Sequence, residues 1–331
     1  MFLSHIHNFR AYAIIGIVGA HSLHAFQWHE NPWVFSFFDT LFNQSSVLFF
    51  FIAGFMFQFL SKRFEKWSYW KKKAKNVILP YLLLSIPSIY YYTTLGVQDN
   101  VWNGFYDNPL YQQIFFFLIT GKHLAPFWFV PTIALFYVVA PLLIRADRDR
   151  RIYWLLPVFM VISFFIGRDG HYGPLNKAAY LFSVYLFGMF ASTYHDQLLA
   201  IVKRYHWLLL AAAIALISGN IFIEGYGQYF QYVLKVLMCP LLLYYFDRAE
   251  PFINDHFSYL AHISFGIFFI HAYVLPVIKM AYLRWSGAVD FPEGNLLAYI
   301  ALTASVTLGC MLIIFLCQKV TGKYSRMLLG A

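Results

Sequence analysis

Long apolar runs, separated by short polar or basic stretches, make up most of this chain. A membrane-spanning helix needs about 20 predominantly apolar residues, within a range of roughly 17–25. By that criterion the pattern predicts about ten transmembrane helices, near residues 11–27, 43–60, 77–95, 127–144, 152–167, 178–194, 207–223, 230–246, 259–279 and 296–317. The apolar run at 111–121 is short, which leaves three readings: an eleventh span, a re-entrant segment or an amphipathic surface helix.

The distribution of basic residues favours ten spans over eleven. Cytoplasmic segments of membrane proteins carry an excess of Lys and Arg. With ten spans, the basic segments 62–75 and 145–151 lie on the same side as both termini, together with most of the 24 Lys and Arg residues. An eleventh span would move 145–151 to the other side. We therefore expect both termini in the cytoplasm.

Composition supports the same class. The chain is 60% hydrophobic and 12% charged, whereas a soluble domain carries about 25% charged residues. The sequence predicts an all-α polytopic membrane protein, with residues 1–331 as a single integral-membrane domain and no appended soluble domain. The net charge of +9 is explained by topology, so no nucleic-acid partner is expected. The three cysteines show no metal-binding spacing, and no metal is predicted.

Three ionisable residues in, or directly before, the first apolar run do not suit a lipid environment. A helix rises about 1.5 Å and turns about 100° per residue, so His21 lies roughly 16 Å beyond Arg10 and only about 20° round the axis. His24 lies about 40° away in the other direction. Such a stripe must face protein or a water-filled cavity. One interpretation is hydrogen bonding that holds helices together, and the other is a functional site.

A second feature is the basic run before the third predicted span, which contains Lys71, Lys72, Lys73 and Lys75. Such runs often only fix topology or contact anionic lipid headgroups. The alternative is a phosphate clamp for a nucleotide cofactor.

Further polar residues fall inside or beside the other spans. Ser264 and His271 lie seven residues apart, which places them on one face of a helix. Lys235 either snorkels to the interface or pairs with an acid such as Glu224. Asn43 and Gln44 are candidates to line the same cavity as His21.

These segments, in this order, resemble the family-3 membrane acyltransferases, which O-acylate bacterial polysaccharides and O-antigen. The first span resembles the family's pattern of Arg, ten residues, then His. SSVLFFFIAGFMF is similar to its Phe-Phe-x-x-Ser-Gly-Phe segment, with Ala53 where Ser is usual, and KKKAKNVILPYLL resembles its basic run before a proline, with Lys72 and Lys75 in place of Arg. KHLAPFWFV resembles its His-Leu-Trp-Phe segment, which adds His123 and Trp128 as cavity-lining candidates, and FSYLAHISFGIFFIH is similar to its late Ser-to-His span.

The resemblance implies acetyl-CoA as the donor, with Arg10 and the lysines of 71–75 binding its nucleotide end. The acceptor implied is a polysaccharide or lipid-linked glycan outside the bacterial cytoplasmic (inner) membrane, and biosynthesis or secretion machinery is an expected partner beside membrane lipids. His21 is expected to act as a general base on the sugar hydroxyl or as a nucleophile that carries the acetyl group. Ser264, Asn43 or His271 would stabilise the oxyanion.

Two hypotheses from other classes stay open at this point. A transporter or flippase of lipid-linked saccharides would use the histidines as a proton relay, although no internal repeat of the kind seen in many transporters is evident. A structural subunit of a secretion complex would need no catalytic histidine.

Overall fold

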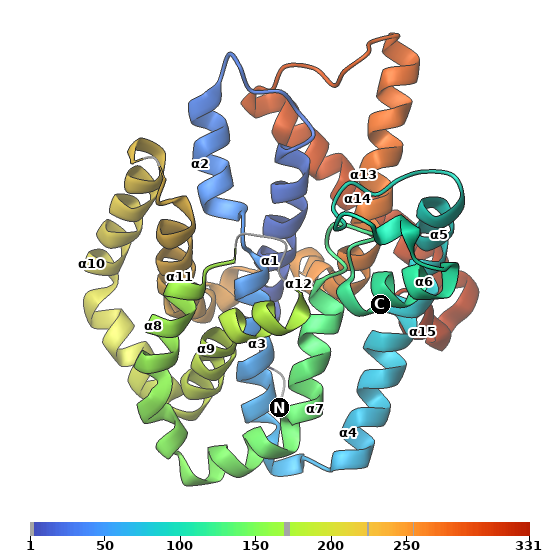
Figure 1. The fold of residues 1–331 in the computed structure, drawn as a ribbon. Helices are drawn as coiled ribbons and strands as arrows, with labels where there is room; N and C mark the ends of the chain where they lie inside the picture. Colours follow the sequence, from blue (N-terminus) through green and yellow to red (C-terminus); the bar gives the residue numbers. More distant parts are fainter. Residues whose placement is uncertain (1–2, 169–172, 224, 254) are drawn as a thin grey trace.

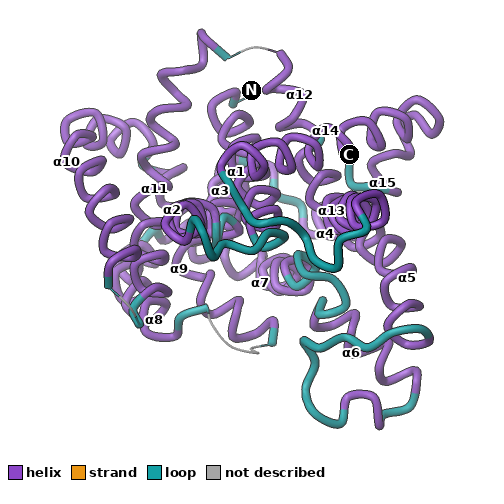
Figure 2. The backbone as a smooth tube through the Cα atoms, turned by 90° about the horizontal axis from the view of Figure 1, so that it is seen from above, coloured by secondary structure: helices purple, strands orange, loops and turns teal. Residues whose placement is uncertain are grey.

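The computed structural model describes residues 3–168, 173–223, 225–253 and 255–331, and these form helices joined by loops (Figures 1 and 2). A π-helix, Ala74–Ile78, joins α4 to α5. The helices are α1 Ser4–Leu23, α2 Pro32–Phe42, α3 Ser46–Phe59, α4 Lys66–Lys73, α5 Leu79–Thr94, α6 Leu110–Thr120, α7 Phe129–Asp149, α8 Leu156–Ile166, α9 Pro174–Thr193, α10 His195–Phe222, α11 Gly227–Ala249, α12 Asp255–His262, α13 Ser264–Ser286, α14 Leu296–Thr321 and α15 Ser325–Leu328.

Six segments of the described chain are long and apolar enough to cross a membrane: Pro32–Phe59, Phe129–Asp149, His195–Phe222, Gly227–Phe252, Ser264–Ser286 and Leu296–Leu328. Each overlaps a span predicted from sequence, which supports a multi-pass membrane protein. The other four predicted spans are also helical, but α5 and α8 are shorter and α1 and α9 are less apolar. The count of ten and the side on which the termini lie therefore stay predictions.

Two boundaries differ from the sequence prediction. The second span does not begin at 43: helix starts at Pro32 and breaks between α2 and α3, where Gln44 has a φ of +60°. Asp39 and the polar residues 43–46 hid its first half in the hydrophobic pattern. The first span was predicted to include His24, but α1 ends at Leu23. The short run at 111–121 forms α6, an 11-residue helix.

In both views α1 and α3 lie in the middle of the bundle, α10 and α11 at one edge, and α5 and α6 at the other (Figures 1 and 2). The basic α4 and the turn between α7 and α8 lie at the same end, at the bottom of Figure 1. The loop after α1 and the loop before α14 meet at the opposite end, where the Asn31 side chain donates to the Gly294 carbonyl. The two strongest runs of positive charge thus share one end of the bundle.

The central helices α3 and α9 pack with their backbones in contact through two glycines. A Cβ atom added at Gly54 would lie 2.0 Å from the carbonyl oxygen of Tyr185, and one at Gly188 would lie 2.0 Å from that of Phe51. Small residues allow this close approach, which membrane helices use because burial alone does not drive their association in lipid.

We predict that Gly54→Ala destabilises the protein, because the new methyl group forces α3 and α9 apart. Overpacking of a core costs about 1–3 kcal/mol or more. The midpoint of thermal unfolding in detergent should fall. Gly173→Ala is the control, since its Cβ would meet nothing within 4 Å. Equal midpoints for the two variants would contradict the close packing.

Candidate active site

Helices α1 and α13 run side by side and pair two groups of polar residues. At the beginning of both helices, the Arg10 guanidinium donates a 3.1 Å hydrogen bond to the Ser264 hydroxyl. Ser264 is completely buried. Ser264, which the family resemblance implies as a catalytic residue, lies beside Arg10, two helical turns before His271.

Further along the same two helices, the rings of His21 and His271 lie 5.2 Å apart between centroids. The Nδ1 of His271 lies 2.9 Å from the carbonyl oxygen of Ile267. Because a carbonyl only accepts, this nitrogen carries the proton, and the lone pair of a neutral ring lies on Nε2. That Nε2 is buried and has no hydrogen-bond partner among the described residues. The pair therefore offers an unused basic nitrogen inside the bundle.

A cavity of about 370 Å³ opens between the basic segment 68–76 and residues 323–327 near the end of the chain. Five cationic side chains and no acidic one are among the residues that line it: Ser68, Lys71, Lys72, Lys75, Asn76, Lys323, Arg326 and Met327. Three of these lysines were predicted from the basic run. Lys323 and Arg326 were missed, because they lie about 250 residues away in sequence and no local pattern connects them to the run.

Lys73 and Arg10 extend this positive charge toward the centre of the bundle. The Lys73 ammonium lies 4.7 Å from the centroid of the Tyr137 ring. Burial, together with the charges of Arg10 and Arg326, lowers the pKa of Lys73 to about 8. Since Arg326 lines the cavity, these charges connect the cavity to the Arg10–Ser264 pair.

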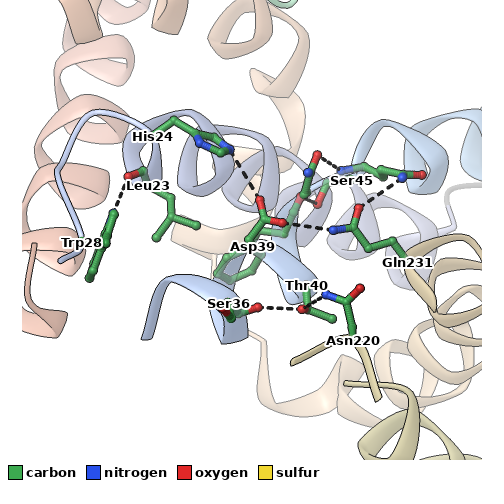
Figure 3. Close-up of polar contacts among 12 residues, drawn as sticks. Leu23, His24, Trp28, Ser36, Asp39, Thr40, Ser45, Asn220 and Gln231 are labelled. Atoms are coloured by element: carbon green, nitrogen blue, oxygen red, sulfur yellow. Dashed lines mark hydrogen bonds and ion pairs between the residues drawn. The ribbon is translucent and has the colours of Figure 1, made fainter. Parts of the chain in front are cut away.

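A polar network surrounds the break between α2 and α3 (Figure 3). Asp39 lies 3.4 Å from the Nε2 of His24 and accepts a 3.0 Å hydrogen bond from Gln231. Gln44 donates to Gln231 and accepts from the hydroxyl of Tyr180. Asp39 and Gln231 were not among the predicted residues, because each is a single polar residue in an apolar run. His24, with 55% of its side chain exposed, is the accessible member of this network.

Lys235 is completely buried next to this break. Its ammonium donates to the carbonyl oxygens of Thr40 and Leu41, at the end of α2. Carbonyls at a helix end within a membrane must find partners inside the protein. Lys235 therefore caps α2 and does not snorkel. Glu224, the acid considered as its partner, lies outside the described residues.

Three residues predicted to line the cavity make contacts that do not involve His21. His123 is completely buried, with its Nδ1 3.0 Å from the Phe117 carbonyl and its Nε2 2.8 Å from the Ser85 hydroxyl, so both nitrogens are engaged between α5 and α6. The Lys177 ammonium lies over the Trp128 ring, 4.4 Å from its centroid, in a cation–π contact. Asn43 accepts from the backbone N–H of Gln44.

Comparison with known proteins decides the family. The acyltransferase domain model of family 3 matches residues 4–315, which is nearly the whole chain. The chain belongs to the family-3 acyltransferases. No curated protein and no solved structure matches this acyltransferase. Membership favours an enzyme over the transporter and the structural subunit considered from sequence.

We predict that Lys235→Met destabilises this acyltransferase, because the carbonyls that end α2 lose their donor. A buried polar group left without a partner costs about 1–3 kcal/mol. The measurement is the midpoint of thermal unfolding in detergent. Lys203→Met, at an exposed lysine, should leave it unchanged, and the capping role is wrong if the two variants unfold alike.

Proposed function

We propose that this family-3 acyltransferase moves an acetyl group from acetyl-CoA to a hydroxyl of a polysaccharide or lipid-linked glycan on the other side of a bacterial cytoplasmic membrane. The observation that carries the proposal is the acid-free basic cavity, joined through Lys73 and Arg10 to the helix that bears His21. The cavity marks the cytoplasmic end, where the donor is made and where positive charge accumulates.

The cavity suits the nucleotide end of coenzyme A. Its volume falls within the range of about 300–1,000 Å³ that small-molecule sites occupy. Lysine binds phosphate as a point charge, and Lys71, Lys72 and Lys75 come from one turn and the π-helix that follows it. Arg326 supplies the planar guanidinium that lysine lacks.

The pantetheine arm then follows α1 inward. Arg10 and His21 lie roughly 16 Å apart along the helix axis, so the arm brings the thioester from the first residue to the second. Ser264 holds the Arg10 guanidinium in place at the entrance to this path.

The tautomer of His271 sets the role of His21. His271 keeps a lone pair on its buried Nε2, which has no hydrogen-bond partner among the described residues and lies beside the His21 ring. That lone pair favours the His21 tautomer whose N–H faces His271, so the other nitrogen of His21 is the base. That nitrogen takes the proton of the acceptor hydroxyl as the oxygen attacks the thioester carbon. When the carbon–sulfur bond breaks, the proton passes to the leaving thiolate and gives free CoA.

Alanine variants of His21 and Arg10 should separate chemistry from donor binding. His21→Ala should lower acetyl transfer by roughly 10²–10⁴-fold and leave the Kd for acetyl-CoA nearly unchanged, because the ring does not hold the nucleotide. Arg10→Ala should instead raise that Kd roughly ten- to hundredfold, as expected for losing a hydrogen bond to a charged group.

Donor binding by the purified variants and release of CoA in the presence of glycan measure the two effects. His206→Ala, at a half-buried histidine of α10 that lies outside the proposed site, is the control and should retain both. Near-normal turnover by His21→Ala would contradict the assignment of His21 as the base. Release of no CoA by the unmodified protein would favour a flippase.

Donor binding should also weaken as the pH rises. With its pKa near 8, Lys73 is charged at pH 6.5 and mostly neutral at pH 9.5, while the CoA phosphates stay ionised. The loss of this positive charge should raise the Kd roughly tenfold. Lys73→Arg keeps its charge, so its Kd should vary much less over this range. The same pH dependence in both proteins would exclude Lys73 from the donor site.

A further inference from the structure

Outside the proposed active site, a histidine and two carboxylates from separate segments come together at the beginning of α1. They are His5, Asp247 near the end of α11, and Glu250 in the 3₁₀ turn that follows α11. One nitrogen or oxygen atom from each residue lies within 4.8 Å of the others. The acetyl-transfer mechanism uses none of these residues.

His5 is a buried histidine whose ring nitrogens lack hydrogen-bond partners in the described part of the chain. Only 7% of the residue is exposed. Its Nε2 is buried without a hydrogen-bond partner among the described residues. Its Nδ1 faces Asp247 at 3.9 Å, which is too long for a hydrogen bond. A buried imidazole is normally hydrogen-bonded, whereas the Nδ1 of His5 faces Asp247 without a hydrogen bond and is available to a ligand there.

A metal ion held by the Nδ1 of His5 and the two carboxylates would give this nitrogen a partner. Imidazole nitrogen and carboxylate oxygen bind zinc at about 2.0–2.2 Å, so two such ligands of one ion lie between about 3 and 4 Å apart. The 3.9 Å separation of His5 and Asp247 falls in this interval. Asp247 and Glu250 lie at the solvent boundary, which gives an ion a route in and lets both side chains rotate toward it.

We propose that His5, Asp247 and Glu250 bind a first-row divalent transition metal. Mg²⁺ and Ca²⁺ prefer oxygen ligands throughout, whereas imidazole with carboxylate suits Zn²⁺ and its neighbours. His195 lies beside this group: its ring centroid is 5.3 Å from that of His5, and its Nε2 is also buried with no hydrogen-bond partner in the described part of the chain.

Sequence spacing gave no sign of this site, since His5 and the two carboxylates lie far apart in the sequence. His5, the ligand on α1, lies five residues before Arg10. Binding would connect the beginning of α1 to the end of α11. Its role is therefore to fix the register of the helix that carries the proposed donor and catalytic residues, without contact with the substrate.

The test uses the full chain, purified in detergent, freed of any affinity tag and treated with EDTA. Zn²⁺ is added in increments, and binding is followed by calorimetry and by the midpoint of thermal unfolding. We expect one equivalent to bind and the midpoint to rise, since a ligand of the folded state stabilises it. Mg²⁺ should produce neither effect.

His5→Ala and Asp247→Asn should each weaken Zn²⁺ binding at least tenfold, while His206→Ala should bind as the unmodified protein does. Asp247→Asn changes a partly exposed side chain, so it tests the site even if His5→Ala fails to fold. Absence of stoichiometric binding, or equal binding by Asp247→Asn and the unmodified protein, would overturn the site. Acetyl transfer is not the readout, so this result is independent of the proposed function.

Discussion

The structure depends on one constraint: a polar group inside an apolar helical bundle must face another polar group or water, because lipid offers it no partner. Arg10 meets this constraint through Ser264, and Lys235 through the carbonyls that end α2. Asp39 meets it between His24 and Gln231. The contacts of Arg10, Lys235 and Gln231 join helices that are distant in sequence. Polar residues therefore help to determine how the helices of the bundle pack.

The same contacts give α1 two chemically different ends. Its beginning lies beside a concentration of positive charge with no acid in the cavity lining. Its end carries His21 beside a histidine whose tautomer is fixed by a backbone carbonyl. A donor with an anionic nucleotide and a neutral thioester arm matches this order of groups along one helix. In our account the acetyl group therefore needs no separate mobile carrier, because the pantetheine arm of the donor is long enough to follow the helix.

Sequence alone was sufficient where the pattern is local. The spacing of Arg10 and His21, and that of Ser264 and His271, predicted that each pair shares one face of its helix, and all ten apolar runs are largely helical. It failed where partners are distant: the basic run gave no sign of Arg326, and nothing near Lys235 in sequence identifies the end of α2 as its partner. The break at Gln44 was missed because a left-handed residue other than glycine leaves no mark in a hydrophobicity pattern.

The central claim is that the basic cavity and His21 are two ends of one donor-binding path. The most direct measurement is an electron cryo-microscopy structure with a non-hydrolysable acetyl-CoA analogue bound. Our account predicts density for the phosphates among Lys71, Lys72 and Arg326, and the carbonyl of the analogue at the His21 ring. Phosphates bound elsewhere, or an analogue whose arm ends away from His21, would contradict it.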